Sequence, residues 1–168
     1  MVGGMAETQR RPVPRNDDGE LDTALAFLTF ARESVLIKTE GLSDEQLRRV
    51  LVDTGTNLLG LVQHLTVAER YWFGHHLADV EPPQDWDYGM SVPVSRGTEE
   101  VLEGYRAASR RSDELIRDLG DPTALAVRPV DGKRVTLRWV LAHMTSETVR
   151  HAGHADILRE QLDGTTGR

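Results

Sequence analysis

The stretch from Leu137 to Leu162, LRWVLAHMTSETVRHAGHADILREQL, decides the fold of this chain. On an α-helix each residue advances by about 100° around the axis. Plotted in this way, one face of the stretch collects its apolar side chains, which lie roughly between 60° and 160° when counted from His143. These are Val140, Leu141, Met144, Ala155 and Leu158. The stretch therefore predicts a long helix that packs one face against a core.

Three histidines and one glutamate share a narrow arc of the same helix. Counted from His143, Glu147 lies at about 40°, His151 at about 80° and His154 at about 20°. Glu147 and His151 thus fall at or inside the edge of the apolar stripe, whereas His143 and His154 fall just outside it. A carboxylate turned toward an apolar interior costs free energy unless it is paired or bound to a metal. A solvated helix edge is the ordinary alternative, but this pattern favours Glu147 and His151 as metal ligands.

A third ligand has to come from another part of the chain. His64 is the best candidate, because it lies in the middle of a helical stretch and is flanked by apolar residues. Taken alone it would be read as a core histidine. His75 and His76 follow beside Gly74, near the expected end of that helix, and are predicted to face solvent. Two histidines and a carboxylate suit Zn²⁺ with one position left for water or substrate, and Ni²⁺, Fe²⁺ and Mn²⁺ also accept these donors.

The rest of the chain predicts an all-α fold, a four-helix bundle. Ser43 is a plausible N-cap for a short helical turn. Asp131-Gly132, between β-prone residues, predicts a short hairpin-like segment before the last helix. Ala78–Gly97 is a long connection, of a length that usually serves a site. Helical periodicity predicts the other three long helices from Glu20 to about Gly41, from about Thr56 to Leu77 and from roughly Thr98 to Leu119.

The domain organisation expected from this pattern is simple. Residues 1–18 are rich in Gly, Pro, Arg and polar residues and predict a flexible N-terminal arm. Residues 19–164 form one helical, metal-binding domain, and residues 165–168 form a tail. One domain is also what the length of 168 residues favours.

Composition excludes several classes of function. The net charge of −7 argues against a nucleic-acid partner, whose phosphates call for a basic surface. The chain has no cysteine, so it can form no disulfide, supply no thiolate ligand and use no cysteine nucleophile. Any thiol chemistry must therefore use a thiol from a small molecule. No segment is apolar enough to predict a membrane span or a signal peptide, so that no membrane partner and a cytoplasmic location are expected.

The helical run from Leu137 to Glu160, with His64 in a preceding helix, resembles the DinB/YfiT-like metal-binding superfamily, and most of all its actinobacterial branch. The set of ligands is also similar to that of the metal-binding domain of mycothiol-dependent maleylpyruvate isomerase. This resemblance implies a DinB-like bundle in which His64, Glu147 and His151 bind a divalent metal. It also implies a homodimer and a low-molecular-weight thiol as co-substrate.

Together these features predict a metal-dependent enzyme that activates a small thiol, as an S-transferase or isomerase of the mycothiol type, for a small-molecule substrate. Arg150, Arg159 and Arg70 could receive a carboxylate or sugar hydroxyls. His154 and His143 are the candidate catalytic groups, through proton transfer. Two alternatives stay open, a metal-dependent hydrolase and a non-catalytic dimeric module that binds a metal or ligand under stress.

Overall fold

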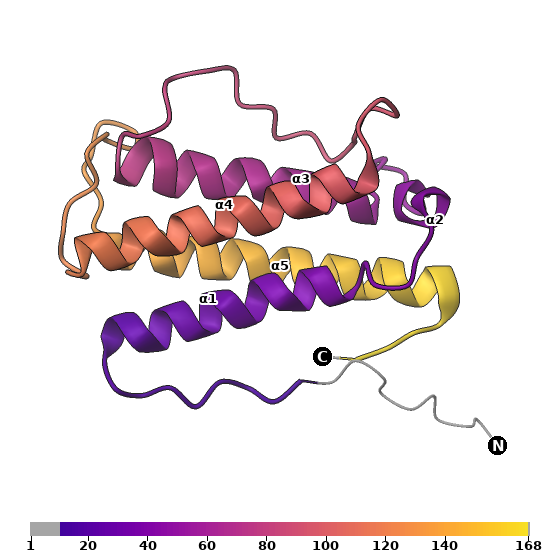
Figure 1. The fold of residues 1–168 in the computed structure, drawn as a ribbon, viewed down its shortest axis with the longest axis horizontal. Helices are drawn as coiled ribbons and strands as arrows, with labels where there is room; N and C mark the ends of the chain where they lie inside the picture. Colours follow the sequence, from indigo (N-terminus) through magenta and orange to yellow (C-terminus); the bar gives the residue numbers. More distant parts are fainter. Residues whose placement is uncertain (1–10, 168) are drawn as a thin grey trace.

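The computed structural model describes residues 11–167, and in this part of the chain four long helices lie side by side (Figure 1). In the view of Figure 1, α3 and α4 lie above α5 and α1. The predicted all-α bundle is therefore confirmed. The helical elements of the described residues are α1 (Glu20–Ile37), α2 (Asp44–Arg48), α3 (Leu58–Glu69), the π-helical segment η1 (Arg70–Leu77), α4 (Thr98–Leu119) and α5 (Leu137–Asp163).

Local sequence signals explain where the helices begin and end. Ser43 caps α2 in a capping box, in which its side chain accepts from the backbone N–H of Gln46 and the Gln46 side chain accepts from the backbone N–H of Ser43. Asn57 and Thr136 cap α3 and α5 by accepting from backbone N–H groups of their first turns. At the other end of α5, Gly164 adopts a left-handed conformation with φ 76°, which a residue without Cβ reaches at little cost.

The hairpin-like segment is present as two isolated antiparallel bridges. Val130 and Lys133 exchange backbone hydrogen bonds of 2.8 and 2.9 Å around a tight turn. Asp131 and Gly132, at its centre, both have positive φ, of 46° and 78°. That pair of conformations is typical of the two-residue turns that match the twist of a hairpin. The turn leads the chain from the end of α4 into α5.

The interior consists of two apolar clusters with a polar layer between them. One cluster contains Leu65 and Leu158, and the other contains Phe73 and Met144. Between them, Arg32 of α1 donates two hydrogen bonds to the fully buried carboxylate of Glu69, at 2.8 and 2.7 Å. Glu147 and His151 lie between Met144 of one cluster and Ala155 of the other along α5, and His64 of α3 meets them there. The fold thus brings these polar side chains into the middle of the bundle.

The helix predicted from Thr56 to Leu77 differs from the observed one in two ways. It begins two residues later, because Asn57 is the capping residue, and it widens into η1 from Arg70 onward. The prediction that His75 and His76 face solvent is wrong, since both side chains are buried. The returning chain covers them: the backbone oxygen of Glu81 lies 2.9 Å from Nδ1 of His75, and the N–H of Arg128 donates to the oxygen of His76.

The remaining segments follow the surface of the bundle. The 78–97 connection crosses over α3 in Figure 1 without forming a helix. In residues 11–18, Arg11 pairs with Glu33 of α1, whereas residues 1–10 of the predicted arm lie outside the described residues. The predicted division into arm, bundle and tail stays a prediction. No helix within residues 11–167 is both long and apolar enough to cross a membrane.

Candidate metal centre

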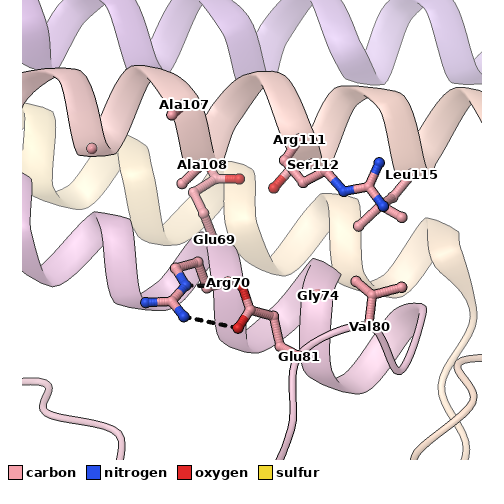
Figure 2. Close-up of a pocket in the computed structure, with 11 residues that line it drawn as sticks. Glu69, Arg70, Gly74, Val80, Glu81, Ala107, Ala108, Arg111, Ser112 and Leu115 are labelled. Carbon is pink, nitrogen blue, oxygen red and sulfur yellow. Dashed lines mark hydrogen bonds and ion pairs between the residues drawn. The ribbon is translucent and has the colours of Figure 1, made fainter.

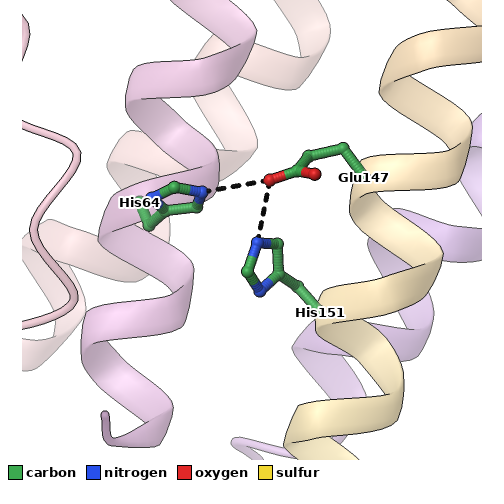
Figure 3. A group of neighbouring side chains, drawn as sticks. All are labelled: His64, Glu147 and His151. Carbon is green, nitrogen blue, oxygen red and sulfur yellow. Dashed lines mark hydrogen bonds and ion pairs between the residues drawn. The ribbon is translucent and has the colours of Figure 1, made fainter. Parts of the chain in front are cut away.

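Three side chains from two helices meet in the polar layer of the bundle (Figure 3). His64 projects from α3, and Glu147 and His151 project from α5, one helical turn apart. Each side chain offers one ligand atom, and these three atoms all lie within 4.8 Å of one another. Oε1 of Glu147 lies 3.3 Å from Nε2 of His64 and 2.9 Å from Nε2 of His151. The structure thus brings together the three residues that the sequence predicts as metal ligands.

His64 is held in one orientation by the 78–97 connection. Its Nδ1 lies 2.9 Å from the backbone oxygen of Tyr88. A carbonyl oxygen can only accept, so Nδ1 carries the proton and donates it in this hydrogen bond. This leaves Nε2, which faces Glu147, as the ring atom that would bind a metal. Metal-binding histidines are usually oriented by a hydrogen bond of this kind from the other ring nitrogen.

Glu147 stays ionised in this half-buried position. Burial raises the pKa of its carboxyl group, but the hydrogen bonds from His64 and His151 and the positive charge of Arg150 outweigh burial, so the net pKa lies below the ordinary value. Arg150, one turn further along α5, forms an ion pair with the other oxygen, Oε2. A carboxylate that is ionised near neutral pH is the form that a metal requires.

His151 is the most deeply buried residue of the cluster on α5. Burial lowers the pKa of its imidazole, and although Glu147 raises it, the net shift is downward. The ring is therefore neutral at neutral pH, as a metal ligand has to be. Two imidazoles and one carboxylate form a donor set that fits Zn²⁺, and three protein ligands leave a fourth tetrahedral position for another molecule.

The two outer histidines lie on either side of the cluster, as their positions on the helix predict. His154 is exposed, and its Nδ1 lies 3.3 Å from Nδ1 of His151. His143 is half-buried, stacked on Trp139 at 5.1 Å between ring centroids and packed against Trp72 at 4.4 Å. Burial lowers the pKa of His143. Neither ring is part of the three-residue cluster.

Of the three predicted arginines, only Arg150 lies at the cluster. Arg70 forms an ion pair of 2.8 Å with Glu81 at the edge of a separate cavity of about 360 Å³ between η1 and α4 (Figure 2). Arg159 is buried two turns beyond His151, where it donates to the backbone oxygens of Lys38 and Glu40. These bonds satisfy carbonyl groups just after α1, so Arg159 has a structural role here rather than a free guanidinium for a ligand.

Sequence reasoning missed two surfaces next to the cluster. The first is the aromatic platform, which we define as Trp72, Trp139 and His143. The spacing of four residues between Trp139 and His143 could have indicated it. The second is an apolar cavity of about 610 Å³, to which Val52 and Met90 contribute and whose wall includes His154. Its lining comes from three distant segments of the chain, so no local pattern indicated it.

A sequence profile described as MST, Mycothiol-S-transferase, matches residues 23–164 of this chain. The match covers most of the chain and includes all three residues of the cluster. It confirms the predicted resemblance to the DinB-like metal-binding superfamily. No curated protein matches the sequence.

Proposed function

The chain belongs to the mycothiol-S-transferase family, and from this premise we propose that it is a metal-dependent enzyme that joins a small thiol, through its sulfur, to an electrophilic substrate. The observation that carries the proposal is the convergence of His64, Glu147 and His151, whose ligand atoms lie within 4.8 Å of one another, with Glu147 ionised. A divalent metal held there would deprotonate a thiol that coordinates it.

The residues of the chain supply what such a reaction needs besides the metal. The absence of cysteine means that the reacting sulfur is that of a bound small molecule. The hydrogen bond from His64 to Tyr88 fixes the ring that faces the reacting centre. Arg150, which is exposed beside Glu147, offers further N–H donors to a carboxylate or hydroxyl group of the thiol.

The proposal extends to the metal, the compartment and the assembly. We propose zinc, because a set of two histidines and one carboxylate is a common catalytic zinc site. A small thiol is kept reduced in the cytoplasm, which is the compartment that we propose. Resemblance to bundles that commonly dimerise supports a homodimer.

Metal analysis of purified protein tests the proposal. Glu147→Gln keeps the size of the side chain but removes its charge, so the variant should keep its helical content and lose most of the bound zinc. Glu160→Gln, on the exposed face of the same helix, is the matched control and should bind zinc as the wild type does. If the wild-type protein, after incubation with zinc and removal of the excess, contains no metal, the proposed function is wrong.

A further inference from the structure

Two chemically different surfaces lie on opposite sides of the metal cluster along α5. Trp139 lies eight residues before Glu147, a rise of about 12 Å, and Ile157 lies six residues after His151, a rise of about 9 Å. Trp139 belongs to the aromatic platform, and Ile157 lines the apolar cavity. The cluster therefore separates an aromatic surface from an aliphatic one.

The segment that contains α3 and η1 shows the same order, and the 78–97 connection shows part of it. Trp72, in η1, follows His64 by eight residues and packs against His143, whereas Thr56, just before α3, lines the apolar cavity. In the 78–97 connection, Tyr88 contacts His64 and Met90 lines the cavity. Two independent segments thus place an aromatic group, the cluster and the cavity in the same order, and the third joins the cluster to the cavity, so the arrangement does not depend on a single side chain.

The aromatic platform offers flat faces with polar edges to a ligand. The rings of Trp139 and His143 are nearly parallel, with 6° between their planes, and Trp139 is 43% exposed. The C–H faces of a sugar ring pack well on such surfaces, while its hydroxyls need donors and acceptors nearby. Arg150 and the imidazole of His143 can supply them.

The apolar cavity offers a different environment. Its volume of about 610 Å³ is in the range of sites for small molecules. Val52, Met90, Ile157 and Leu158 contribute aliphatic and thioether surface to it. His154, which also lines the cavity, contacts His151. A molecule in the cavity is thus separated from the cluster by one imidazole.

We propose that the two substrates reach the cluster from opposite sides. The sugar-bearing part of the thiol lies on the aromatic platform, and an apolar electrophile occupies the apolar cavity, so that sulfur and electrophilic carbon meet beside His151. This inference rests on the proposed function. With 1-chloro-2,4-dinitrobenzene, the S–C bond forms, the C–Cl bond breaks, chloride leaves with the bonding electrons and the thiol proton passes to solvent.

Variants of the platform test the position of the thiol. Mycothiol carries a sugar and a cyclitol on an acylated cysteine, whereas N-acetylcysteine lacks both. Trp139→Ala should raise KM for mycothiol by about five- to tenfold and leave KM for N-acetylcysteine unchanged. Phe27→Ala, which removes an aromatic ring of similar exposure (40%) from α1, is the control and should change neither.

Variants of the cavity test the position of the electrophile. Ile157→Asp places a charge among apolar side chains, so kcat/KM for 1-chloro-2,4-dinitrobenzene should fall by about tenfold or more, while that for the small polar iodoacetamide is kept. Val149→Asp is the matched control, because Val149 is on the same helix and equally exposed, at 53% against 55%. It should leave both values at the wild-type level.

Calorimetry provides a readout that does not need activity. The wild type should bind mycothiol, and the unreactive analogue 1,3-dinitrobenzene should bind even without metal. Trp139→Ala should weaken only the binding of mycothiol, and Ile157→Asp should weaken only the binding of 1,3-dinitrobenzene. Equal affinities in wild type and variants would overturn the inference, and so would a rise in KM for both thiols in Trp139→Ala. Absence of transfer in the wild type, with these binding differences present, would refute the proposed function and leave the two surfaces as binding sites.

Discussion

Replacing Gly60 by alanine should weaken metal binding although the residue is not a ligand. Gly60 lies in the first turn of α3, four residues before His64. By helix propensity alone, alanine would be favoured there by about 1 kcal/mol. The structure predicts the opposite effect on the site, because a Cβ at this position would lie 1.9 Å from the backbone oxygen of Met90 and 2.3 Å from its carbonyl carbon.

The size of the effect follows from this contact. Cβ atoms do not approach other atoms more closely than 3.0 Å, so the backbone at Met90 has to move by roughly 1 Å or more. Tyr88, two residues earlier, accepts the 2.9 Å hydrogen bond that orients His64, and a shift of this size breaks it. Loss of such an orienting bond lowers metal affinity by about 10- to 100-fold, which is about 1.4–2.7 kcal/mol.

The assay is competition for zinc with a chromogenic chelator at neutral pH, together with thermal unfolding of the metal-free protein. Gly60→Ala should lose zinc at a lower chelator concentration and keep the helical content of the wild type. Gly104→Ala in α4 is the control, since a Cβ there meets no atom within 4 Å. If Gly60→Ala and Gly104→Ala bind zinc with the same affinity, the role assigned to the Tyr88 contact is wrong.

Two further predictions concern the polar layer and the buried histidines. Arg32→Met leaves the carboxylate of Glu69 buried without its bidentate partner, so the free energy of unfolding in urea should fall by about 3–5 kcal/mol. The double variant Arg32→Met/Glu69→Gln should recover most of the lost free energy. If it recovers none, the explanation is wrong. Burial lowers the pKa of His76 below its ordinary value of 6.5. The unfolded state therefore binds a proton at this residue more readily than the folded state does. The free energy of unfolding is then highest above about pH 6.5 and decreases as the pH falls through and below that value. Metal-free His76→Gln should therefore lose less unfolding free energy than the wild type between about pH 7.5 and about pH 5.5, and identical losses would exclude this role.

The elements of this protein could be predicted from sequence because their signals are local. The apolar stripe of α5, the Ser43 capping box and the Asp131-Gly132 turn each depend on residues a few positions apart. The end of the second long helix could not be predicted in this way. There, His75 and His76 are buried by the chain that returns at Glu81 and Arg128, and such coverage depends on residues far along the sequence.

The candidate site also has one part that could be predicted from local sequence and another part that could not. The sequence by itself determined that Glu147 and His151 share the inner edge of one helix, because helical geometry fixes the angle between residues four apart. Only the tertiary structure decided that His64 faces them, that Tyr88 orients its ring and that an aromatic and an apolar surface lie on either side. Those relations join α3, α5 and the 78–97 connection, whose relative placement is set by packing of the whole core, and no periodicity within one segment encodes it.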